Sequence, residues 1–122
     1  MIQKQRGFSL IEVLIGLIFL AIGLLAMAAL QATSIRGNFF SNNLMQATYV
    51  AQDRLEFLKN LPLDSPALQA GNYNPIPAIL SGVVFNQSYT VVVSGDLKTI
   101  HYTVTWNDGM NHNVTFSTIR SQ

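Results

Sequence analysis

The sequence predicts an α+β fold in which one long N-terminal helix packs against a small antiparallel sheet of three strands. Three observations lead to this prediction. Residues 8–30 are almost uniformly apolar, and residues 31–61 repeat apolar side chains at the spacing of a helix. From residue 83 onward, apolar side chains alternate with polar ones, as in a half-buried strand. A segment that contains all four prolines, residues 62–82, separates the two patterns.

The apolar run, Phe8–Leu30, contains 14 Leu, Ile, Val and Phe residues and a single charged residue, Glu12. A helix of this length crosses a hydrocarbon core of about 30 Å. Its large apolar residues favour insertion by about 4–8 kcal/mol, and one ionisable residue costs about 3 kcal/mol. The run is therefore predicted to span a membrane. Lys4 and Arg6 precede it, which places its start on the cytoplasmic side and the C-terminal part across the membrane.

Glu12 is the residue of this run that requires an explanation. Because it lies near one end, its carboxylate could reach back to the lipid headgroups. Alternatively, it could pair with an amine at the same depth. Cleavage between Gly7 and Phe8 would create such an amine on Phe8, one helical turn from Glu12. Gly7 has no side chain, so its backbone can closely approach a protease.

The segment Arg6–Ile15, RGFSLIEVLI, resembles the type III signal of type IV prepilins and pseudopilins. The resemblance implies a pilin-like fold and a leader peptide comprising residues 1–7. It also implies that a membrane aspartyl peptidase cuts after Gly7 and methylates the new N-terminal Phe8. Glu12 would then pair with the terminal amine of a neighbouring subunit during fibre assembly.

The same resemblance implies the partners and the location of the chain. The partners would be the prepilin peptidase/N-methyltransferase and other major and minor pilins, which it would contact through the N-terminal helix. It would reside in the bacterial inner membrane, with its C-terminus in the periplasm, and then in a pilus or pseudopilus. The short cysteine-free head and the segment Ala47–Glu56 are most similar to minor pilins of the PilV type, the type IV pilus modification proteins.

Three alternatives remain beside this interpretation. One is a minor pseudopilin of a type II secretion system. A second, from another class, is a membrane-anchored periplasmic protein that is never processed. A third is a secretory signal peptide cut near Ala26-Met27-Ala28, although the apolar run is longer than such peptides usually have.

Residues 31–61 are predicted to form the amphipathic half of a helix running from about Phe8 to Asn60. Gly37-Asn38 and Asn42-Asn43 have poor helix propensity, which predicts a bend or a frayed turn within Thr33–Asn43. Pro62 is expected to stop the helix. Residues 62–82 are predicted to be an irregular connecting loop. The apolar stripe comprises Phe40, Leu44, Ala47, Ala51, Leu55 and Leu58, widened by Val50, Phe57 and Leu61.

Residues 83–122 are predicted to form the sheet, with turns at Gly95-Asp96 and at Asn107-Asp108-Gly109. Three strands with one apolar face are not stable alone, so the sheet is expected to pack on the stripe Leu44–Leu58. The strands are Val83–Ser94, with Phe85, Tyr89, Val91 and Val93 on the apolar face; Thr99–Trp106, with Ile100, Tyr102, Val104 and Trp106; and about His112–Ile119, with Val114 and Phe116.

The composition argues against several functions. A net charge of +1 with scattered Lys and Arg predicts no nucleic-acid partner, and the absence of cysteine excludes disulfides and thiolate zinc sites. Relative to the apolar faces of their strands, His101 and His112 would point to different sides of the sheet. They are therefore interpreted as surface residues and not as a metal site. Asp96 and Asp108 lie in turns, where Asp is common for backbone reasons. No catalytic residues, cofactor or metal are expected, and the chain is predicted not to be an enzyme.

Overall fold

The computed structural model describes residues 7–121, which divide into two compact units, one up to Phe39 and one from Phe40. Helix α1 (Leu10–Asn60) begins in the first unit and ends in the second. Every residue of Thr33–Asn43 is helical, so the predicted frayed turn is wrong. Helix propagation is cooperative, and favourable turns on both sides carry the helix through these weak residues. The Thr33 hydroxyl donates to the Ala29 carbonyl oxygen at 3.0 Å, within the helix itself.

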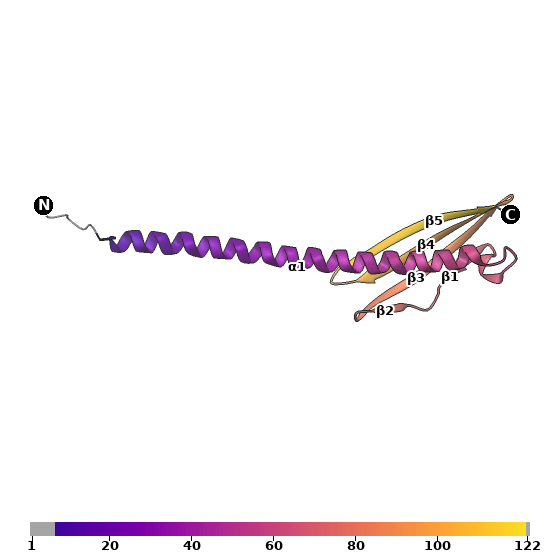
Figure 1. Cartoon of the computed structure of the whole chain (residues 1–122), viewed down its shortest axis with the longest axis horizontal. Coiled ribbons are helices and arrows are strands. Elements are labelled where there is room, and N and C mark those ends of the chain that lie inside the picture. The colour runs from indigo at the N-terminus through magenta and orange to yellow at the C-terminus, as the bar shows by residue number, and fades with distance from the viewer. Residues whose placement is uncertain (1–6, 122) are drawn as a thin grey trace. The chain divides into compact units, whose positions relative to one another are not determined.

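The second unit combines the C-terminal part of α1 with a five-stranded antiparallel sheet (Figure 1). A short 3₁₀ turn, η1 (Pro66–Leu68), follows the helix. The strand order is β1-β3-β4-β5, and β2 also pairs with β3. The strands are β1 (Gly71–Tyr73), β2 (Ala78–Leu80), β3 (Val83–Ser94), β4 (Leu97–Asn107) and β5 (Asn111–Ser121).

The α+β class is confirmed, but the prediction of three strands and an irregular loop over residues 62–82 is wrong in detail. Two strands of three residues each, β1 and β2, lie within that segment and pair with β3. Strands this short leave no alternation to detect, and Pro75 and Pro77 between them suggest only a loop. Ser81 (φ 51°) and Gly82 (φ 79°) then form a tight turn into β3, and both positive φ values fit a type I′ hairpin.

The core lies between the helix face of residues 43–58 and one face of the sheet. Tyr102, Val104 and Trp106 of β4 are buried, as the alternation predicted. The register also agrees, because Trp106 pairs with His112 and His101 pairs with Ser117. The buried apolar residues are Ala47, Val50, Ala51, Leu55, Leu58, Leu68, Phe85, Tyr89, Val91, Ile100, Tyr102, Val104 and Trp106.

Several residues depart from the predicted core. Phe40 and Leu44, at the start of the predicted stripe, are 38% and 36% exposed. Phe57 is 57% exposed, although the stripe was expected to include it, and Val93 near the end of β3 is 42% exposed. Phe57 lies between the buried Leu55 and Leu58 but on another face of α1, and Val93 lies where β3 runs past the covered part of the sheet. Asn43 is 1% exposed although it is polar. Its amide Nδ2 donates to Asp108 Oδ2 at 3.2 Å, which offsets the cost of its burial.

Two cations on adjacent strands hold the C-terminal end of α1 and the loop after it. Arg120 of β5 donates from Nη1 to the carbonyl oxygens of Leu58 (3.2 Å) and Leu61 (2.7 Å). Lys98, its register partner on β4, is 5% exposed and donates from Nζ to Leu63 O (2.6 Å) and Leu68 O (3.1 Å). The last carbonyls of a helix lack intrahelical donors and carry negative partial charge, so Arg120 stabilises the end of α1 through Leu58. Lys98 instead holds the segment after the helix.

Candidate functional site

The predicted cleavage site lies just before the helix, in an exposed segment without regular secondary structure. Gly7 and Phe8 precede α1, and the Phe8 side chain is 88% exposed. A Cβ built on Gly7 would meet nothing within 4 Å. The Gly7–Phe8 bond is therefore accessible from solvent in the described chain. Lys4 and Arg6, which were predicted to fix the membrane orientation, lie outside the described residues.

A capping box formed by Ser9 and Glu12 defines the start of α1. The Glu12 backbone N–H donates to Ser9 Oγ at 3.3 Å, and the Ser9 backbone N–H donates to Glu12 Oε2 at 3.4 Å. Two of the helix N–H groups that lack intrahelical acceptors are satisfied reciprocally in this way. The carboxylate also lies at the positive end of the helix dipole. Both distances are long and both groups are exposed, so the box stabilises the helix start only weakly.

The apolar part of α1 is uncovered along its whole length. Every large apolar side chain from Phe8 to Leu30 is between 47% and 88% exposed. The helix is long and apolar enough to cross a membrane. In water such a surface would be strongly unfavourable, because monomeric soluble proteins rarely expose large contiguous apolar patches. Lipid or other apolar helices are therefore the environment that this segment fits.

The structure brings the three predicted site residues to one end of α1. Gly7 and Phe8 lie immediately before the helix, and Glu12 lies in its first turn. The predicted pair between Glu12 and the Phe8 amine requires cleavage and a neighbouring subunit, so it stays a prediction. Sequence reasoning missed Ser9. The sequence does contain the capping-box pattern. Ser9 stands just before an apolar run, and Glu12 follows three residues later.

A polar cluster joins the β4–β5 hairpin to α1 in the second unit. The Asp108 carboxylate accepts from Asn43 of α1 at 3.2 Å and contacts His112 Nε2 at 2.8 Å. Partial removal from water acts to raise the pKa of Asp108, but the hydrogen bonds from Asn43 and His112 outweigh it and lower that pKa. His112 is half-buried against Phe40 and Trp106, so its interpretation as a surface residue is wrong, whereas His101 is exposed.

A second hydrogen-bond network joins side chains of β3 and β4 to the segment between α1 and β2. The Tyr102 hydroxyl donates to Gln87 Oε1, and Gln87 Nε2 donates to the Ile76 carbonyl oxygen at 2.9 Å. Burial raises the pKa of Tyr102 to about 12. The Tyr89 hydroxyl donates to Ala67 O at 3.1 Å, and burial also raises the pKa of Tyr89. These bonds attach the segment 66–76 to the sheet and make this network structural.

The described part of the chain, residues 7–121, offers no cluster of three or more His, Cys, Asp or Glu side chains that would hold a metal. The Asp108–His112 pair is occupied in joining the hairpin to the helix. Its carboxylate contacts protein groups on both oxygens. We therefore assign the cluster of Asn43, Asp108 and His112 a structural role, and the N-terminal segment is the candidate functional site.

Comparison with known proteins supports this choice. Residues 2–30 match the family described as the prokaryotic N-terminal methylation motif. The matched residues include Gly7, Phe8, Ser9, Glu12 and the apolar run, which is about the first quarter of the chain. No curated protein and no solved structure matched the chain. The motif and the exposed apolar helix fit membrane anchoring, and together they support a precursor of the type IV pilin-like or pseudopilin class.

Proposed function

We propose that the chain is a minor pilin, a non-enzymatic subunit that takes part in the assembly or initiation of a type IV pilus. The observation that carries the proposal is the N-terminal methylation motif placed on an exposed apolar helix with an accessible Gly7–Phe8 bond. In this proposal the prepilin peptidase removes residues 1–7 and methylates the amine of Phe8. The mature chain then stays in the inner membrane until it enters a fibre beside other pilins.

The proposed role of Glu12 follows from the cost of a charge among apolar helices. At the membrane surface its carboxylate has water and the Ser9 N–H as partners. Inside a bundle of apolar helices water is excluded, and an unpaired carboxylate there costs several kcal/mol. The positively charged amine of Phe8 on a neighbouring subunit would offset this cost. The pair would also set the axial register of an incoming subunit.

Two substitutions at Glu12 separate its charge from its capping role. Glu12→Gln keeps a side-chain oxygen that can accept from the Ser9 N–H, because Glu and Gln both serve at this position of a capping box. Glu12→Leu removes both functions. Both variants should be cleaved and retained in the membrane. Both should fall about tenfold or more in sheared fibres, since a loss of 1.4 kcal/mol already corresponds to a factor of ten.

Immunoblotting of membrane and sheared fractions tests the proposal against wild type in the native cell. Normal amounts of Glu12→Gln in fibres would show that the charge pair is not used. A deficit of Glu12→Leu alone would assign the role of Glu12 to the helix cap. Absence of the wild-type chain from sheared fibres, with its leader intact, would favour an unprocessed membrane-anchored protein.

A further inference from the structure

Strand β5 forms one edge of the sheet and pairs on only one side. Its register with β4 is unbroken, from Leu97↔Ser121 to Asn107↔Asn111. No other strand of the described chain pairs with β5 (Figure 1). Its free edge therefore presents a long row of backbone N–H and C=O groups to solvent. Such a row is a template for another extended chain.

The free edge of β5 lacks the features that usually protect an edge strand. Residues 111–119 contain no proline, no lysine or other charged residue except the titratable His112, and their register shows no bulge. Arg120 is turned to the carbonyl oxygens at the end of α1. The opposite edge of the sheet is protected, because β1 and β2 are only three residues long and Pro75 and Pro77 lie between them.

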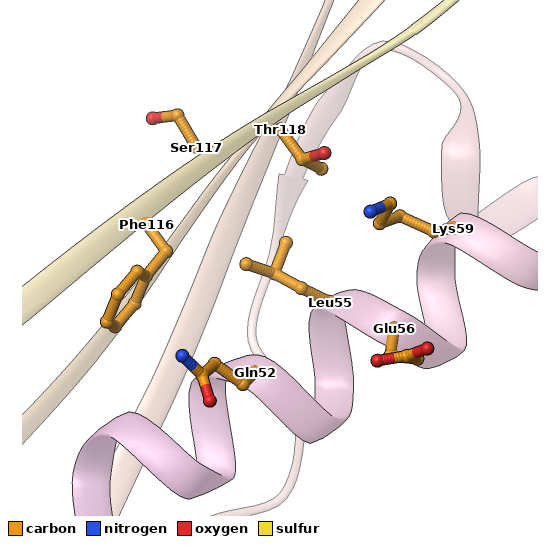
Figure 2. Close-up of a pocket in the computed structure, with 7 residues that line it drawn as sticks. All are labelled: Gln52, Leu55, Glu56, Lys59, Phe116, Ser117 and Thr118. Atoms are coloured by element: carbon orange, nitrogen blue, oxygen red, sulfur yellow. The ribbon is translucent and has the colours of Figure 1, made fainter. Parts of the chain in front are cut away.

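A groove runs beside this edge, between α1 and the inner face of β5. It has a volume of about 300 Å³ and is lined on the helix side by Leu55, Glu56 and Lys59. Phe116 and Thr118 of β5 point into it, whereas Ser117 points to the other side of the strand (Figure 2). The inner-face residues of β5 are only half-buried, while those of β4 are buried. The core is thus incompletely covered at this edge.

We propose that the free edge of β5 binds an extended strand of a neighbouring subunit of a different kind, with one apolar side chain of that strand in the groove. Backbone hydrogen bonds would extend the sheet by one strand. The inserted side chain would contact Leu55 at the base of the groove and cover the half-buried Phe116. Glu56 and Lys59 offer one partner of each charge at the rim. The identity of the occupant as an assembly subunit rests on the proposed function.

A second copy of this chain fits the edge poorly. Antiparallel pairing of two β5 strands creates a two-fold axis perpendicular to the sheet, so residues 40–60 of the two helices would run in opposite directions. In a single fibre, as the proposed function has it, the subunits point the same way, so two second units paired in this manner could not both take that direction. A parallel pair would turn the polar outer face of each β5 toward the groove of the other. The opposite edge of the sheet, formed by strands of three residues, is too short to pair with the β5 edge of a second copy.

Site-specific photocrosslinking in the native cell tests the proposal on the full-length chain. A photoreactive phenylalanine analogue replaces Ser117, on the edge strand, and the crosslinked peptide is identified by mass spectrometry. We expect a crosslink to a strand of another protein that carries the N-terminal methylation motif. It should be at least ten times stronger than from the same analogue at Thr103, on the central strand β4.

Two lysine variants make the test specific for the edge. Thr115 and Thr103 are register partners whose hydroxyls share a hydrogen bond at 2.9 Å, so Thr115→Lys and Thr103→Lys lose the same contact. Only Thr115 lies on β5. A lysine on an edge strand opposes strand addition. Thr115→Lys should therefore reduce the crosslink from position 117 at least tenfold, and Thr103→Lys should leave it within twofold.

Several results would overturn the proposal: no intermolecular crosslink from position 117, a crosslink only to a second copy, a crosslink to a protein without the motif, or a crosslink that persists in Thr115→Lys. The N-terminal peptide from the same sample separates this failure from that of the proposed function. A methylated Phe8 without the edge crosslink rejects the β5 proposal alone. An unprocessed N-terminus rejects the pilin function, and with it the assignment of the occupant as a fellow subunit.

Discussion

Replacement of Trp106 by Ala should remove a large part of the stability of the second unit, which begins at Phe40 and is called the head below. Trp106 is 3% exposed and packs against Phe40, Phe85 and His112, with ring centroids 6.4, 5.9 and 5.4 Å away. Burial of about 200 Å² of aromatic surface at about 25 cal/mol per Å² corresponds to about 5 kcal/mol. Measured Trp→Ala substitutions in cores cost about 3–5 kcal/mol, so the two figures agree.

The head has little stability to spare for this loss. A unit of its size, residues 40–122, is expected to have a free energy of unfolding of about 4–12 kcal/mol. Trp106→Ala should therefore lower the urea midpoint strongly or leave the head unfolded. Trp106→Phe is the matched control. It keeps an aromatic ring at this position and removes the indole N–H, so it should cost only about 1–2 kcal/mol.

Urea unfolding of the full-length protein in detergent micelles, followed by circular dichroism, measures these differences. Trp106 is the only tryptophan, so its fluorescence reports on this site alone in the wild type. Folded protein should show the blue-shifted emission of a buried indole. A water-exposed emission maximum, or a cost below about 1 kcal/mol for Trp106→Ala, would show that the sheet does not pack on α1 through this residue.

Two further predictions concern titratable groups in the head. Tyr102→Phe leaves Gln87 Oε1 buried without its donor and should cost about 1–3 kcal/mol at neutral pH. Because burial raises the pKa of Tyr102 to about 12, the wild-type advantage over this variant should persist below pH 10 and decline as pH rises toward 12, measured by urea unfolding across that range. The pKa of Asp108 is lowered, so its contribution should be present above about pH 4 and disappear as pH falls through the lowered pKa. The stability difference between wild type and Asp108→Asn should therefore shrink below about pH 4, measured by urea unfolding; a difference that does not shrink as the carboxylate is protonated would contradict the hydrogen bonds assigned to Asn43 and His112.

Local periodicity predicted the main elements of the fold. Alternation in β4 correctly placed Tyr102 and Trp106 on the buried face, and the apolar spacing in α1 correctly placed Ala47 and Leu55 there. The end of the helix at Asn60 followed from Pro62. These features depend on neighbours within a few residues, and such patterns are visible in a single sequence.

The missed features depend on contacts between distant segments. Asn43 is buried because Asp108, 65 residues later, accepts from its amide. Lys98 is buried because carbonyl oxygens of the loop after α1 surround its ammonium group. His112 is half-buried because it stacks with aromatic rings from two elements. No local pattern marks these partners, and a polar residue is ordinarily assigned to the surface.

The N-terminal site was predicted in its chemistry but not in its local structure. The order of Gly7, Phe8 and Glu12 along the chain was sufficient to suggest a prepilin-like signal. The hydrogen bonds between Ser9 and Glu12 were not predicted, although the two residues have the spacing of a capping box. In the structure Glu12 already has a local acceptor role toward the Ser9 N–H, so any pairing in a fibre must compete with this weak contact.

In the proposed function the mature chain begins at Phe8. The most direct measurement is mass spectrometry of the N-terminal peptide and of the intact protein from the native cell. We expect the protein to start at Phe8 with a methylated amine, without residues 1–7. A start at Met1, or a start near Ala29, would contradict it, because neither would place a free amine one turn before Glu12.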